Sequence, residues 1–160
     1  MAETHYAKVV WSGGVFGPTN SVANYSREFR AEFEGKPPVH GSADPAFHGD
    51  PPLYNPEDLL LAALSACHML SYLAVCARAG ITVVSYEDRV VGTVAPRGYE
   101  AKFVDVLLHP KVVLEPGSDI EKAKALHEKA HNICVVANSM NFPVRYEPEV
   151  IFATENVAAA

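Results

Sequence analysis

A chain of 160 residues is long enough to form one domain with a substantial hydrophobic core. Its formal net charge of −6 argues against nucleic acid or an anionic membrane as a partner, because phosphate binding needs concentrated lysine and arginine. Three cysteines make no dense disulfide framework, and the N-terminal residues hold no basic region followed by an apolar run. We therefore predict no secretory signal and a location in the reducing cytoplasm.

The chain before residue 55 predicts strands and loops. Residues 6–12 have a β-rich centre that ends at a pair of glycines. Residues 25–33 alternate with the period of a half-buried strand, which places Arg27 among aromatic residues on the inward face and Arg30 on the other face. Residues 37–54 are rich in proline, glycine and aspartate and predict a short edge strand followed by an ordered loop.

The most informative segment runs from Asn55 to Gly80 and predicts one long helix. Asn55 is a good N-cap, and Gly80 can adopt the left-handed conformation that often ends a helix. Residues 59–77 carry no charge and are apolar all the way round, so we expect this helix to be buried on every side. Its length raises the question of a membrane span, but its serine, histidine, tyrosine and cysteine residues favour a buried central helix.

The rest of the chain predicts strands and two helices joined by short links. A single α+β domain over residues 1–160, without linker or repeat, is the expected fold class. The expected elements are two long antiparallel strands at 85–95 and 99–115 joined near Pro96-Arg97-Gly98, a helix at 118–131 with Ser118 as N-cap, a short helix at 134–140 and a last strand at 144–153.

The three cysteines differ in what their positions allow. Cys76 follows Cys67 by nine positions on the predicted helix, so it points about 180° away and lies about 13 Å further along. The two cannot form a disulfide within one intact helix, and Cys76 is expected to be a core residue. Cys134 lies where a helix starts, a place that favours a thiolate. Cys67 and Cys134 could be an attacking and a resolving thiol or two buried structural cysteines, and the residues alone leave both open.

Histidines near the cysteines offer weaker candidates. His127, His131 and Cys134 would line one helix face as a candidate metal site, but a partly solvated helix with two surface histidines explains the same spacing, and we predict no metal ion. His68 is next to Cys67, yet neighbours on a helix diverge by about 100°, which makes His68 a weak candidate for a base.

Several motifs together resemble those of the osmotically inducible protein C and organic hydroperoxide resistance (OsmC/Ohr) superfamily. The similarity spans nearly the whole chain in order, and an OsmC-like subgroup of that superfamily fits most closely. The matching segments are Gly41-Ser42-Ala43, Phe47-His48-Gly49-Asp50, Asn55-Pro56-Glu57-Asp58-Leu59-Leu60, Ala62-Ala63, Ser65-Ala66-Cys67-His68-Met69 and Cys134-Val135-Val136-Ala137-Asn138-Ser139.

The resemblance implies a thiol-dependent peroxidase that reduces organic hydroperoxides to alcohols. Cys67 would attack the peroxide, and its sulfenic acid would condense with Cys134 to a disulfide. Glu57 matches the family's activating glutamate, and Arg27 is our choice for the activating arginine, with Arg30 as the alternative. A dithiol, of the lipoyl type in the hydroperoxide-resistance branch, would be the reductant, and no cofactor is implied.

The helix geometry adds an expectation about assembly. Cys67 lies about three turns into its helix, where the helix dipole no longer favours a thiolate, so a fixed cation is needed. Glu57 precedes Cys67 by ten residues, about 15 Å along a straight helix, which one guanidinium hardly bridges. We therefore expect Glu57 to serve the partner's thiol in an intertwined homodimer, the form that the resemblance also implies.

A second function class stays open. An OsmC-like protein without catalytic activity could bind a ligand or a metal in a stress response. The unresolved arginine favours it, as does His48, which stands at a loop position where an arginine would also have been expected.

Overall fold

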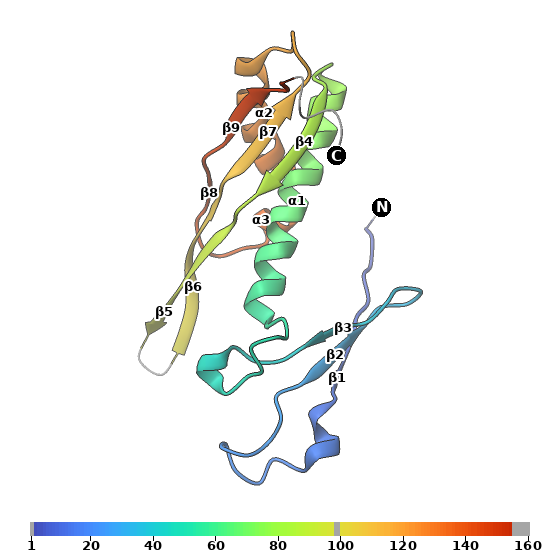
Figure 1. The fold of residues 1–160 in the computed structure, drawn as a ribbon, viewed down its shortest axis with the longest axis vertical. Coiled ribbons are helices and arrows are strands. Elements are labelled where there is room, and N and C mark those ends of the chain that lie inside the picture. Colours follow the sequence, from blue (N-terminus) through green and yellow to red (C-terminus); the bar gives the residue numbers. More distant parts are fainter. Residues whose placement is uncertain (1, 98–99, 155–160) are drawn as a thin grey trace. The chain divides into compact units, whose positions relative to one another are not determined.

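The computed structural model describes residues 2–97 and 100–154. The chain divides into two compact units, one ending at Leu60 and the other beginning at Leu61. The boundary falls within the long helix α1 (Pro56–Arg78), which is drawn in green in Figure 1. Each unit has its own sheet structure.

The N-terminal unit contains one antiparallel sheet in the order β1-β2-β3. The alternation of β2 is confirmed at Ala31, which is buried, while its neighbour Arg30 forms a salt bridge. Residues 25–28 lie outside the strand, because the backbone N–H groups of Ser12 and Gly13 both donate to the carbonyl of Glu28 and the regular ladder ends there. The strands are β1 (Lys8–Trp11), β2 (Phe29–Glu32) and β3 (Val39–Gly41), with 3₁₀ turns at Gly13–Phe16 and Pro45–Phe47.

The loop after β3 is ordered, as predicted, and two of the sequence motifs build it. Ser42 is buried, and its hydroxyl accepts a hydrogen bond of 3.1 Å from the backbone N–H of Asp50. A β-carbon on Gly49 would lie 1.6 Å from the carbonyl oxygen of Ala43, so only glycine fits at that position. The loop then delivers the chain to the start of α1.

Both ends of α1 are set by the residues that predicted them. The side chain of Asn55 accepts from the N–H of Asp58 at 2.7 Å, and the carboxylate of Asp58 accepts from the N–H of Asn55 at 3.2 Å, a reciprocal cap. At the other end Gly80 has a φ of +73°, and the N–H of Ile81 donates to the carbonyl of Cys76 at 3.0 Å.

The prediction that α1 is buried on every side is wrong for the single chain. One stripe is buried, whereas Leu70 on another face is 62% exposed. By length and composition alone α1 could cross a membrane, a test that core helices of soluble proteins also pass. The buried residues of the helix are Leu64, His68, Tyr72, Val75 and Cys76.

The C-terminal unit contains two mixed sheets, in the orders β4-β7-β9 and β5-β6-β8. The expectation of antiparallel sheets holds for the pairs β4–β7 and β5–β6, but β8 and β9 run parallel to their neighbours β6 and β7. Gly98, in the predicted turn, lies outside the described residues. The strands are β4 (Val83–Asp88), β5 (Val91–Arg97), β6 (Glu100–Leu108), β7 (Pro110–Leu114), β8 (Val144–Tyr146) and β9 (Glu149–Phe152).

Each of the two long predicted strands is divided in two at the level of Asp88. The carboxylate of Asp88 accepts from the N–H of His109 at 2.7 Å, and the ring of His109 bonds the carbonyl of Arg89 at 2.9 Å. Side-chain bonds therefore replace the backbone ladder between β4–β7 and β5–β6. The last predicted strand is also divided, into β8 and β9, because Pro148 between them has no N–H to donate.

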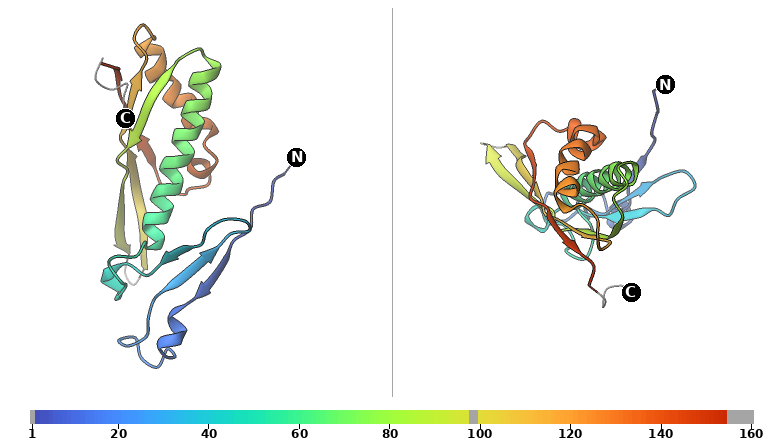
Figure 2. Two further views of the ribbon diagram at one scale, coloured as in Figure 1. Left: turned by 45° about the vertical axis from the view of Figure 1, so that its right-hand side comes forward. Right: turned by 90° about the horizontal axis from the view of Figure 1, so that it is seen from above.

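Two further helices complete this unit. In α2 (Ile120–Ile133) the N-cap is Asp119, whose side chain accepts from the N–H of Lys122, and not the predicted Ser118. The predicted short helix is α3 (Val135–Asn138). Figure 2 shows α1 and α2 on one side of the strands, and residues of α1, α2, β7 and β9 form a common core there.

Candidate functional site

The structure brings Cys67 and Cys134 together. Cys67 lies in the middle of α1 and is partly exposed, while Cys134 connects α2 to α3 and is buried. Both thiols are free, and they lie close enough for Cys67 to raise the pKa of the Cys134 thiol. Cys76 lies in the hydrophobic core, as predicted, where burial raises the pKa of its thiol. The two cysteines that lie near each other are therefore the pair that the sequence motifs single out.

Cys134 caps the N-terminus of α3, as the sequence predicted, but this does not make it a thiolate. Its sulfur accepts a hydrogen bond of 3.4 Å from the N–H of Ala137. Burial raises the pKa of the Cys134 thiol, the adjacent Cys67 raises it further, and the helix-start N–H groups offset only part of this. The effect of burial on the pKa of Cys134 outweighs that of the helix-start N–H groups, so Cys134 is held as a thiol.

Glu57 lies in the first turn of α1, and the helix is unbroken from there to Cys67. The ten-residue separation therefore remains about 15 Å along the axis. One carboxylate oxygen of Glu57 is buried and has no hydrogen-bond partner among the described residues. A buried carboxylate oxygen is costly without a partner, so this one is poised to accept a bond.

The two candidate arginines differ in how their charges are used. The prediction that Arg27 lies on an inward strand face is wrong, since the residue lies in the loop before β2. Its guanidinium donates hydrogen bonds there to the carbonyls of Val22 and Tyr25. The guanidinium also lies 3.8 Å from the centre of the Tyr25 ring. No carboxylate lies within salt-bridge distance of it in the described part of the chain.

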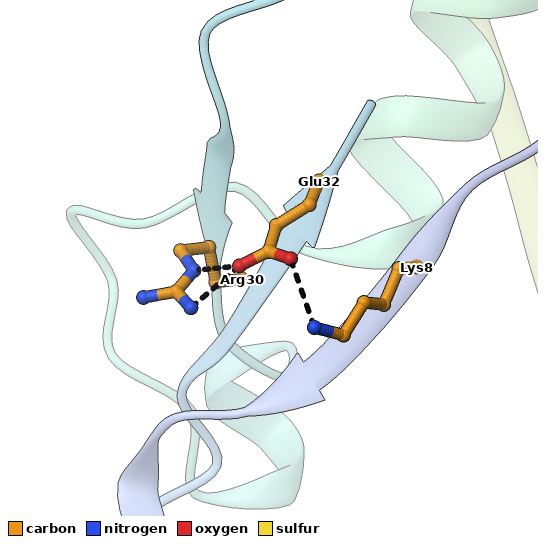
Figure 3. Close-up of polar contacts among 3 residues, drawn as sticks. All are labelled: Lys8, Arg30 and Glu32. Atoms are coloured by element: carbon orange, nitrogen blue, oxygen red, sulfur yellow. Dashed lines mark hydrogen bonds and ion pairs between the residues drawn. The ribbon is translucent and has the colours of Figure 1, made fainter. Parts of the chain in front are cut away.

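Arg30, by contrast, is paired with Glu32. Its guanidinium contacts the Glu32 carboxylate at 2.5 and 2.7 Å, and Lys8 approaches the same carboxylate at 3.3 Å (Figure 3). The hydrogen bond from Arg30 is the main cause that lowers the pKa of Glu32. A salt-bridged surface arginine is the ordinary structural role, so Arg27 remains the better candidate for a cation with a chemical task.

His48, the departure noted in the sequence, ends the 3₁₀ turn Pro45–Phe47 and is exposed. Its φ of +64° is the left-handed conformation, which histidine adopts more readily than most residues other than glycine.

Sequence reasoning missed a buried pair of histidines. It placed His127 on a solvated face, yet His68 and His127 are both fully buried, with Nε2 of His68 3.1 Å from Nδ1 of His127. Their rings are nearly coplanar, and the Tyr72 ring stacks on His127 at 3.9 Å between centres. The available signal was that His68 falls on the same helix stripe as Leu64 and Tyr72.

Both histidines are neutral at physiological pH. The pKa of His68 is lowered to about 4 and that of His127 to about 3, mainly by burial and to a lesser extent by a neighbouring imidazole. Asp88 raises the pKa of His68 against this trend. One ring nitrogen of each histidine, Nδ1 of His68 and Nε2 of His127, is buried without a hydrogen-bond partner in the described chain.

The candidate metal site of His127, His131 and Cys134 is not assembled. The thiol of Cys134 lies near Cys67, and His127 faces His68. Within residues 2–97 and 100–154 no group of three or more histidine, cysteine, aspartate or glutamate side chains is placed to hold a metal ion.

The neutral histidine pair should make stability depend on pH. The folded pKa values of His68 and His127 lie below the unfolded value of 6.5, so stability is fully present above pH 6.5 and is lost as the pH falls toward about 4 and about 3. Each histidine should remove up to about 1.4 kcal/mol of the free energy of unfolding per pH unit. Urea denaturation between about pH 7.5 and 5.5, at one protein concentration, measures this slope.

The matched variants for this measurement keep the hydrogen bond but do not titrate. His68→Gln combined with His127→Asn should flatten the slope, while His40→Gln, at an exposed position of β3, should leave it as in the wild type. A double variant with the wild-type slope would show that other groups govern the acid sensitivity.

Comparison with known proteins places this architecture in one family. A family model described as OsmC-like protein matches residues 48–149, which include the paired cysteines and Glu57. An OsmC-like protein of unknown function from Vibrio cholerae is 30% identical, with a TM-score of 0.81 over 92% of this chain and 100% of that one.

More distant solved structures share the fold. An organic hydroperoxide resistance protein from Legionella pneumophila is 19% identical, with a TM-score of 0.67 over 96% of this chain and 99% of that one. The organic hydroperoxide resistance protein of Bacillus subtilis is 22% identical, with a TM-score of 0.62 over 90% of this chain and 98% of that one. No curated protein matches the sequence significantly.

Proposed function

Because this chain belongs to the OsmC-like protein family, we propose that it is a thiol-dependent peroxidase that reduces organic hydroperoxides to alcohols. The observation that supports this most directly is the proximity of Cys67 and Cys134, through which Cys67 raises the pKa of the Cys134 thiol. A partly exposed thiol beside a buried second thiol is the arrangement that an attacking and a resolving cysteine need.

The proposed reaction proceeds in three steps. The Cys67 thiolate attacks one peroxide oxygen, the O–O bond breaks, and the alkoxide leaves and takes a proton to become the alcohol. The resulting sulfenic acid then condenses with the Cys134 thiol, which forms the S–S bond and releases water. A dithiol, for which the lipoyl type is our proposal, reduces the disulfide and returns both thiols in a reducing cytoplasm.

Arg27 and Glu57 are proposed to activate the first step. A thiol in the middle of a helix needs a fixed cation to become a thiolate, and Arg27 carries a charge that no carboxylate within the described residues neutralises. The unpartnered carboxylate oxygen of Glu57 can hold and orient such a guanidinium. The arginine would also stabilise the negative charge that grows on the leaving oxygen.

A homodimer with two sites is part of the proposal. Along an unbroken helix Glu57 lies about 15 Å from Cys67, so the glutamate would act on the partner's site. The exposed apolar residues of α1, such as Leu70, are consistent with cover from a second subunit.

The proposal is tested by the fate of the thiols. One equivalent of cumene hydroperoxide should link Cys67 to Cys134 and leave Cys76 free, because Cys76 is buried in the core away from the paired thiols. Peptide mapping under non-reducing conditions identifies the bridge, and peroxide consumption with a dithiol measures turnover. A bridge through Cys76 would overturn the assignment, and a lack of peroxide consumption would favour a non-catalytic binding protein.

A further inference from the structure

Two successive hydrogen bonds join α1 to α2 and lead toward the two thiols. The hydroxyl of Tyr72 donates to the carbonyl of Ala123 at 3.1 Å, in the interior. His68 lies one turn before Tyr72 on α1, and His127 lies one turn after Ala123 on α2. Their imidazoles form the next hydrogen bond, of 3.1 Å. The two rungs are the hydrogen bonds Tyr72–Ala123 and His68–His127, and the neighbouring thiols of Cys67 and Cys134 lie beyond the second rung.

We propose that His68 and His127 are positioning residues for the dithiol: their buried hydrogen bond fixes the rotation and register of α1 against α2 and so holds Cys67 against Cys134. This inference rests on the proposed function, in which the two thiols must condense. The bond is the rung nearest the thiols, and His68 directly follows Cys67 in the same rigid helix.

The surroundings make this bond hard to replace. Both rings are fully excluded from solvent and are flanked by the aromatic rings of Tyr72 and Tyr146. One nitrogen donates and the other accepts, so separating the rings would leave a buried donor and a buried acceptor unpaired, which is costly. A roll of α1 that separated the rings would also displace the neighbouring Cys67, since successive residues are about 100° apart on one helix.

The charged and titratable groups around the pair do not supply an alternative bond. Asp88 of β4 and His131 of α2 influence His68 through their charges, but Asp88 is occupied by Ser65 at 2.5 Å and by the N–H of His109 at 2.7 Å. The His131 ring lies 6.4 Å from the His68 ring between centres.

The consequence is measurable as a thiol–disulfide equilibrium. Oxidised dithiothreitol and the reduced protein exchange two electrons and two protons to give reduced dithiothreitol and the Cys67–Cys134 disulfide. Thiols held near each other form the disulfide more readily, so loss of the positioning bond should lower the equilibrium constant for disulfide formation at least tenfold, which is about 30 mV for this couple.

Reciprocal substitutions distinguish positioning from mere packing. The bonding atom of His68 is Nε2, which a glutamine amide can reach and an asparagine amide cannot, whereas that of His127 is Nδ1, which an asparagine amide replaces best. We expect His68→Gln and His127→Asn to retain the wild-type equilibrium within about twofold and His68→Asn and His127→Gln to show the tenfold loss.

Tyr72→Phe is the matched control, because it removes the next rung of the ladder without touching the one beside the thiols. It should lower stability and leave the equilibrium within about twofold of wild type. An equal shift in Tyr72→Phe, or the same response to asparagine and glutamine at both histidines, would overturn the inference. Two histidine positions keep the test decisive if one variant fails to fold.

The measurement uses no peroxide, so it fails separately from the proposed function. Wild-type protein that consumes no hydroperoxide but shows the reciprocal pattern would overturn the peroxidase proposal and support the positioning pair. Protein that consumes hydroperoxide but shows no reciprocal pattern would support the peroxidase proposal and overturn the positioning role of the histidine pair.

Discussion

Replacing Cys67 by serine should abolish peroxide turnover, while replacing Cys134 by serine should still permit one oxidation per subunit. Attack on the peroxide needs only the first thiolate, because a serine hydroxyl is not ionised at neutral pH and is a poor nucleophile. Recycling needs the second thiol, which in the structure lies near the first. Stopped-flow consumption of cumene hydroperoxide and trapping of the sulfenic acid with dimedone measure the two steps separately.

Cys76→Ser serves as the control for these two variants, because Cys76 is a core thiol away from the pair. It should retain turnover, with a loss of stability from a buried hydroxyl. If Cys67→Ser and Cys134→Ser lost the single oxidation equally, the proposed order of attack and resolution would be wrong.

A heterodimer of Glu57→Ala and Cys67→Ser subunits should have about half the wild-type activity if Glu57 serves the partner's thiol. Both lesions then fall in one site and the other site is intact. The reason to expect this is the unbroken helix, which separates the two residues by about 15 Å. Each homodimer should be nearly inactive.

Co-expression with two tags gives the mixed dimers for this experiment. If Glu57 acts within its own subunit, each site of the heterodimer carries one lesion and the activity should be near zero. A heterodimer as inactive as the homodimers would show that Glu57 does not serve the partner's Cys67. A protein that is monomeric in solution would contradict the same arrangement, because it requires two subunits.

Local signals explain why the sequence predicted α1 so well. The side chain of Asn55 and the glycine at position 80 act on their immediate neighbours, so their effect is visible in a window of a few residues. The prediction that α1 is buried on every side was wrong for the single chain. The apolar composition of a helix indicates which residues can be buried, but it does not indicate whether the same chain or another chain buries them.

The divided strands depend on contacts between distant residues and could not be read locally. Asp88 and His109 interrupt two strands at once, through a bond that spans 21 positions. The same holds for the parallel pairing of β8 and β9, which only the return of the chain after α3 decides.

The candidate site shows the same division. The sequence motifs single out Cys67 and Cys134, but the pKa direction of Cys134 required knowledge of its burial, which opposes the effect of the helix start. His127, the hydrogen-bond partner of His68, lies 59 positions away in the sequence. Without knowledge of that partner, the sequence gives no reason to expect a buried imidazole in the core.

The cap on α3 also gives the protein a reporter of its own. The amide proton of Ala137 points at the Cys134 sulfur, with 3.4 Å between nitrogen and sulfur. A thiol, a mixed disulfide and an internal disulfide differ as acceptors, so the magnetic resonance of this one proton registers which form is present. A sample labelled with nitrogen-15 only at alanine would then display the oxidation state during turnover, with no dye attached and no cysteine modified.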